Sequence, residues 1–179
     1  MRSAASGVVP WLVAILLACG LSACKSSGAT DDAGAIGDAD FVNCAAETRA
    51  TPFQPGMQVT SRSGGYVVKA LQNTFVDPNK QVLTIPPAKG IDTWTIETDR
   101  AATGTPVDGM SITVSPYMPD HRHGTTAVGV TAAGAGTYTI NPLNLYMAGY
   151  WEITFNLTDP SAGDAPVTDS AMFPICVPD

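Results

Sequence analysis

The chain has 179 residues, with 16 Asp or Glu against 9 Lys or Arg, so its formal charge is −7. This acidic balance argues against a nucleic-acid-binding protein, because phosphate backbones are bound by clustered basic side chains. Hydrophobic residues make up 45% and charged residues only 14%, with 17 Gly and 14 Pro. This composition excludes a disordered chain and favours a turn-rich all-β domain over a helical bundle. The length suits one ordinary domain with a tail.

The first 23 residues predict an export signal. An apolar run at residues 8–17 follows Arg2, the only charged residue before it. The run is too short to span a bilayer comfortably and fits the hydrophobic part of a signal peptide. It ends in Leu21-Ser22-Ala23-Cys24, which resembles the bacterial lipobox, where the cysteine is lipidated and becomes the first residue of the mature protein. We therefore expect a lipoprotein with a lipid anchor on Cys24. An uncleaved anchor and an ordinary signal peptide are the alternatives, and both place the rest of the chain outside the cytoplasm.

Residues 24–43 predict a flexible acidic linker behind the lipidated cysteine. They are small and acidic, so they cannot bury enough apolar area to offset the entropy of ordering. Lys25 follows Cys24, where an Asp would resemble a signal for retention in the inner membrane. We therefore expect the protein in the bacterial cell envelope, anchored in the outer membrane and facing the periplasm or the surface. The folded domain is expected at residues 44–179.

Two cysteines remain in this expected domain, Cys44 and Cys176. An exported protein occupies a compartment that permits oxidation, so we expect a disulfide that joins the two ends of the domain. Neither cysteine has a second Cys or a His nearby in the sequence. Two buried free thiols and a metal-binding pair remain as alternatives.

From Met57 onward, short alternating apolar stretches are separated by clusters of Gly, Pro and Asp, which is typical of strands and turns. The expected strands lie at residues 66–71, 91–98, 110–115, 128–130, 137–140, 151–157 and 171–177. The last is expected at a sheet edge because Pro174 lacks an N–H donor. No sustained 3.6-residue periodicity follows the signal, so helices should be scarce. About seven antiparallel strands predict an immunoglobulin-like β-sandwich, with a barrel as the alternative.

Both histidines of the protein, His121 and His123, come directly after a predicted strand. In extended backbone they would point to the same side with Cα atoms roughly 6.5–7 Å apart, so both could reach one metal ion. Met118 lies three residues earlier and Met147 in another predicted loop. Imidazole and thioether ligands suit copper, especially Cu(I), whereas a zinc site would depend on Asp120 as a further ligand. The alternative is a structural role, in which the histidines only hydrogen-bond to loop backbone or to Asp120.

The segment Met118-Pro119-x-His121-x-His123-Gly124 resembles the signature of YtkA-like domains, which are small modules of the bacterial envelope. The patterns Gly136-x-Tyr138-x-Ile140 and Met147-x-Gly149-x-Trp151 are similar to later parts of the same family, and the resemblance runs from about Val59 to Leu157. It implies an immunoglobulin-like sandwich connected with heavy-metal handling, above all of copper.

Two positions depart from the family's pattern. Arg122 stands where a small residue is common, and a cation between two metal ligands would raise the cost of binding another cation. Ala148 replaces the usual proline after Met147, which loosens the second loop.

The first functional hypothesis is therefore a lipid-anchored module that takes Cu(I) weakly through His121, His123 and a methionine. Such a module would exchange copper with an envelope protein partner. The second hypothesis is a structural or adhesive domain without a metal, which binds proteins through exposed edges and loops. An exposed row of tyrosines would support it: Tyr117, Tyr146 and Tyr150. We do not expect an enzyme, because two histidines are too few for a metallohydrolase and no nucleophile-elbow or phosphate-loop motif is present.

Overall fold

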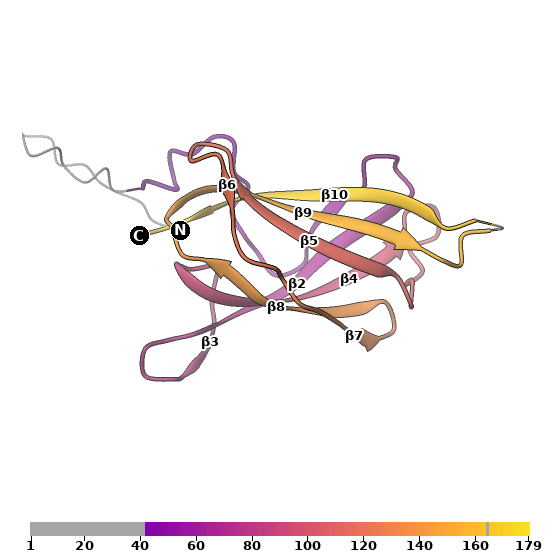
Figure 1. Cartoon of the computed structure of the whole chain (residues 1–179), viewed down its shortest axis with the longest axis horizontal. Coiled ribbons are helices and arrows are strands. Elements are labelled where there is room, and N and C mark those ends of the chain that lie inside the picture. Colours follow the sequence, from indigo (N-terminus) through magenta and orange to yellow (C-terminus); the bar gives the residue numbers. More distant parts are fainter. Residues whose placement is uncertain (1–41, 164) are drawn as a thin grey trace, which may run out of the picture. The chain divides into compact units, whose positions relative to one another are not determined.

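The computed structural model describes residues 42–163 and 165–179. The expected signal peptide, Cys24 and nearly all of the expected linker lie outside these residues. The described part of the chain forms ten strands and no helix (Figure 1). The strands are β1 (Met57–Thr60), β2 (Tyr66–Val76), β3 (Val82–Thr84), β4 (Gly90–Arg100), β5 (Ser111–Met118), β6 (His123–Gly124), β7 (Val130–Gly134), β8 (Thr137–Leu145), β9 (Gly149–Asp159) and β10 (Val167–Val177). Over these residues, no helix has the length and apolarity that crossing a membrane requires.

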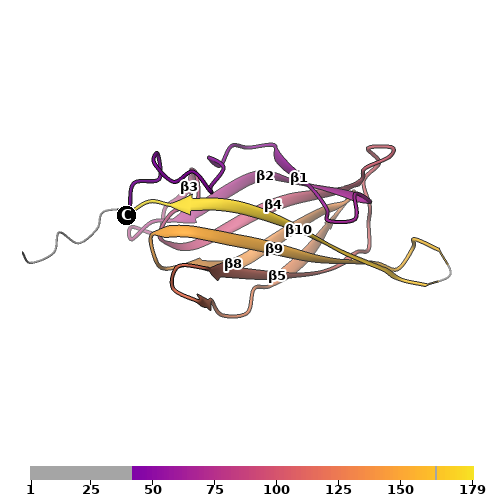
Figure 2. The same cartoon turned by 90° about the horizontal axis from the view of Figure 1, so that it is seen from above.

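The strands pair into two antiparallel sheets, which pack face to face (Figure 2). One sheet has the order β1-β2-β4-β8-β7, with β3 added to β2, and the other has the order β10-β9-β5-β6. The expected all-β sandwich is confirmed. The alternative, a closed barrel, is wrong because the strands form two separate sheets. The strand number exceeds seven because the short strands β1, β3 and β6 have too few residues to show an alternating pattern.

The core lies between the sheets and follows from the alternation of the strands. In β9 every second side chain is buried, as the sequence predicts: Trp151, Ile153, Phe155 and Leu157. Trp94 of β4 faces them, and its ring lies 6.3 Å from Phe155 and 5.7 Å from Phe173, measured between centroids. Aromatic side chains bury large apolar areas, so this cluster across both sheets is a major source of the sandwich's stability.

A tight hairpin at Gly134-Ala135-Gly136 joins β7 to β8. All three residues have positive φ, with values of 87°, 51° and 70°. Gly136 is also crowded: a Cβ atom there would lie 2.8 Å from the Cβ of Pro106 and 2.9 Å from the carbonyl oxygen of Thr98. Both conditions require glycine at this position.

A disulfide joins Cys44 to Cys176, with a Cα–Cα distance of 5.5 Å, which confirms the predicted pair. It ties the segment before β1 to β10, which is an edge strand as Pro174 predicts. The bond spans 132 residues of sequence. Closing so long a loop restricts the unfolded chain, which stabilises the fold by about 5 kcal/mol in the chain-entropy description.

Candidate functional site

The two histidines lie on the turn between β5 and β6. The turn is closed by a hydrogen bond of 2.8 Å from the Arg122 N–H to the Met118 carbonyl oxygen, and Arg122 has a φ of 56°. His123 then pairs back onto Met118. The backbone is therefore not extended through both histidines, because the chain reverses between them.

The turn nevertheless brings the two imidazole rings together. Their centroids are 5.8 Å apart and their planes are inclined by 58°, and both side chains are exposed. Two imidazoles that share one ion through bonds of about 2 Å have centroids roughly 5–6 Å apart. The spacing of the rings therefore fits a shared ion.

A backbone contact sets the orientation of one ring. Nδ1 of His123 lies 3.0 Å from the Gly124 carbonyl oxygen, so this nitrogen carries the proton when the ring is neutral. Metal-binding histidines commonly donate one N–H to a carbonyl in this way, which fixes the ring and leaves the other nitrogen to bind the ion. Nε2 of His123 is thus the available ligand atom.

The two predicted sulfur ligands lie in different surroundings. Met118 is fully buried, and its methyl group packs so tightly against Gly149 that a Cβ there would lie 2.9 Å from it. Met147, in the loop between β8 and β9, is 37% exposed and lines the same hollow as His123. The fold therefore keeps one sulfur in the core and one at the surface.

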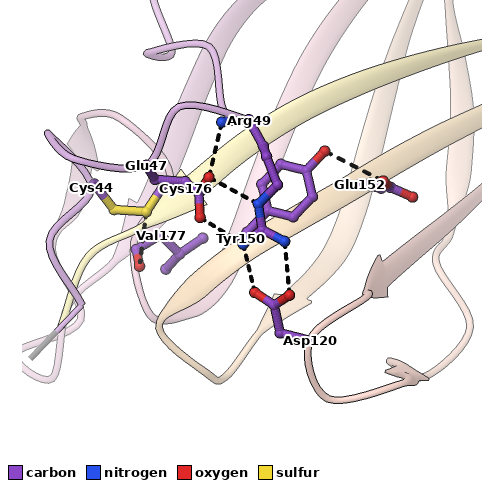
Figure 3. Close-up of polar contacts among 8 residues, drawn as sticks. All are labelled: Cys44, Glu47, Arg49, Asp120, Tyr150, Glu152, Cys176 and Val177. Atoms are coloured by element: carbon purple, nitrogen blue, oxygen red, sulfur yellow. Dashed lines mark hydrogen bonds and ion pairs between the residues drawn. A yellow bond between two sulfur atoms is a disulfide. The ribbon is translucent and has the colours of Figure 1, made fainter. Parts of the chain in front are cut away.

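The loop aspartate is held by an arginine that the sequence analysis did not single out. Arg49 donates to both carboxylate oxygens of Asp120 at 2.7 Å and also binds Glu47 at 2.7 Å (Figure 3). Its guanidinium lies 4.3 Å above the ring centroid of Tyr150. Because Arg49 binds both carboxylates, it lowers the pKa of Asp120 and that of Glu47.

This arrangement limits the choice of metal ligands. Asp120 already binds Arg49 through both oxygens, so it is occupied as a ligand. Among the described residues, no three His, Cys, Asp or Glu side chains come together as a metal site. Any ion at the turn would depend on the two imidazoles and a sulfur.

The expected row of exposed tyrosines is not formed. Tyr117 and Tyr146 are 41% and 58% exposed. Tyr150 is buried beneath Arg49, so its inclusion in the row was wrong. Only two of the three rings are open to a partner.

One family of known proteins matches this chain. Residues 78–156 match the family model described as YtkA-like. The matched segment begins later than the expected start near Val59, and it includes both histidines, Met118 and Met147, but not Arg49 or the two disulfide cysteines. No curated protein and no solved structure matches the chain.

Proposed function

Because the chain carries a YtkA-like domain at residues 78–156, which indicates an envelope-associated module, we propose that it binds Cu(I) through His121 and His123. The observation that carries this proposal is the 5.8 Å separation of the two exposed rings. The module would be held at the outer membrane by lipid on Cys24 and would exchange copper with an envelope protein.

Met147 is the preferred sulfur ligand in this proposal. Its side chain is partly exposed beside His123. Met118 borders a second hollow, which His121 lines, but its side chain is fully buried. A thioether is a soft ligand and favours Cu(I) over zinc, and imidazole binds both. Two imidazoles and one thioether would give a three-coordinate site without a carboxylate.

The charges around the turn are compatible with a weak cation site. Arg49 is neutralised by Asp120 and Glu47, so it adds little positive potential. Arg122 is exposed between the two histidines, and its charge opposes binding of a further cation. We therefore expect modest affinity, which suits exchange of copper rather than permanent storage.

The test measures Cu(I) affinity by competition with a coloured Cu(I) chelator, in ascorbate and without thiols, so that the disulfide stays intact. The protein is the full chain with Cys24→Ala, which prevents lipidation. The His121→Ala/His123→Ala variant should lose affinity at least tenfold, and Met147→Leu should lose more than Met118→Leu. Affinity should also fall below about pH 6, because only neutral imidazole binds the ion.

Two results would reject the copper site: no uptake of Cu(I) by the parent protein, or equal uptake by the double histidine variant. The anchor is tested separately, by supplying labelled fatty acid to cells that express the parent chain or Cys24→Ala. The parent should incorporate the label and the variant should not; equal labelling of the two would reject a lipid on Cys24.

The second candidate function is protein binding without a metal. It is favoured by Tyr146 and Met147, whose exposed side chains flank a largely apolar hollow over Trp151. In that case Tyr146→Ser should abolish binding of an envelope partner, and the double histidine variant should bind it normally. If copper exchange is the function, the double histidine variant is the one that fails.

A further inference from the structure

One edge of the four-stranded sheet is left open along most of β5. On one side β5 pairs with β9 from Ser111 to Tyr117. On the other side it pairs with β6 only at Tyr117 and Met118. Gly124 lies against the Pro116 carbonyl, where a Cβ atom would be 2.8 Å from the oxygen. Within residues 42–163 and 165–179, no strand covers this edge from Ser111 to Ser115.

The other edges of the sandwich are protected in ways that natural sheets commonly use. β10 contains Pro174, and its edge accepts hydrogen bonds from the Thr51 and Arg62 N–H groups at 2.8 and 2.7 Å. β7 is interrupted by an irregularity between Ala132 and Gly134. β1 and β3 have only 4 and 3 residues. The Ser111–Ser115 edge has none of these devices and carries no charged side chain.

The sequence of this edge is self-complementary. It is Ser-Ile-Thr-Val-Ser, which has the same pattern in both directions around Thr113. We propose that the Ser111–Ser115 edge pairs with the same segment of a second copy of this chain, antiparallel about a twofold axis at Thr113. Ser111 of one copy would then face Ser115 of the other, and Ile112 would face Val114.

This pairing suits the side chains on both faces of β5. Ser111, Thr113 and Ser115 are exposed and polar, whereas Ile112 and Val114 are buried. Serine and threonine pairs across strands form hydrogen bonds, and β-branched pairs pack well. In the new pairing, the polar side chains of both copies would therefore lie together on the outer face, and the apolar side chains would lie together on the inner face.

The neighbouring strand on the same side of the sandwich does not oppose close approach. β7 lies next to β5, and its sequence is Val-Thr-Ala-Ala-Gly. Its side chains are small and uncharged, so two copies can approach without bringing like charges together. The absence of charge on β7 favours pairing, because two copies that each carry a formal charge of −7 repel each other.

The size of the pairing predicts a weak dimer. Five residues on each strand form roughly four to six main-chain hydrogen bonds between the copies. The contact is small compared with stable protein interfaces. We expect a dissociation constant on the order of 10–1,000 μM.

The test is sedimentation equilibrium of the full chain with Cys24→Ala, from micromolar to millimolar concentration. Thr113→Lys places two like charges opposite each other at the axis and should weaken the dimer at least tenfold. Thr168→Lys makes the same charge change at an exposed position of β10. Because β9 separates β10 from β5, the two added lysines of a dimer would lie at least four strands apart, so this variant should leave the dimer unchanged. A monomer over the whole range, or equal effects of the two lysines, overturns the proposal.

A second measurement identifies the register. Thr113→Cys places two thiols directly opposite each other, where Cβ atoms of paired strands are about 4.5–5.5 Å apart, so mild oxidation should link the copies covalently. Thr168→Cys serves as the control and should remain monomeric on denaturing, non-reducing gels. Equal crosslinking of both variants would show random collision and would refute this register.

Discussion

Asp92 is a fully buried carboxyl group whose substitution should stabilise the protein at neutral pH. Its Oδ1 accepts hydrogen bonds from the Asn73 amide at 2.8 Å and the Ala88 N–H at 3.2 Å, but its Oδ2 has no partner. Burial raises the pKa of Asp92 from 3.8 to about 6, against the effect of these two hydrogen bonds. The folded protein therefore holds a proton on Asp92 over a range of pH in which the unfolded chain has released it.

The shift gives both the sign and the size of the effect. Because the folded-state pKa is the higher one, the free energy of unfolding falls as pH rises from 3.8 to about 6 and then levels off. At 1.36 kcal/mol for each pKa unit, the ionised group costs about 3 kcal/mol at pH 7. Asp92→Asn removes the charge and should raise the free energy of unfolding by up to that amount.

The assay is urea denaturation of the parent and Asp92→Asn at intervals between pH 4 and pH 7.5. The gain in stability should be largest above pH 6 and should shrink toward pH 4. Asp159→Asn is the matched control, since Asp159 is equally buried. Burial alone would raise the pKa of Asp159, but hydrogen bonds from Ser161 and Tyr66 and the charge of Arg100 lower it. Its removal should therefore destabilise at pH 7. A loss of stability in Asp92→Asn that does not change with pH would refute the reasoning.

Two further predictions concern the hairpin and the arginine beside the candidate site. Gly136→Ala should destabilise the fold by more than Gly134→Ala. Both residues have positive φ, but a Cβ atom at Gly136 would clash with Pro106 and Thr98, whereas a Cβ atom at Gly134 would meet nothing within 4 Å. The strained backbone costs about 1 kcal/mol at either position, so thermal unfolding of the two variants measures the additional clash, and equal losses would contradict it. Arg49→Gln should raise the pKa of Asp120, because the hydrogen bonds and charge of Arg49 lower it. NMR titration of the Asp120 carboxyl group measures this shift. An unchanged titration would show that the ion pair does not form in solution.

The sequence predicted the features that repeat along a strand or have few possible partners. The stripe from Trp151 to Leu157 identifies β9 and its buried face, and Pro174 identifies an edge strand. Cys44 and Cys176 could be paired because they are the two cysteines of the expected domain at residues 44–179. These inferences need only local alternation and counting.

The features that were missed depend on contacts between distant residues. Arg49 and Asp120 are 71 residues apart, and a single pair of charges produces no periodic pattern. Arg49 also covers Tyr150, which strand alternation alone would leave exposed. The positive φ of Arg122 has no sequence signal either, because glycine and asparagine are the usual residues in that conformation. The candidate site residues were chosen for their chemistry, but their backbone geometry required the structure.

The disulfide also determines how the domain would respond to mechanical force. A load applied to the chain before Cys44 and to the C-terminus after Cys176 passes directly through the sulfur–sulfur bond to the end of β10. The strands between the two cysteines lie in a closed covalent loop and carry none of that tension. A pull between the two ends of the chain would therefore stretch only the segments outside the loop, leaving the turn with the two histidines folded.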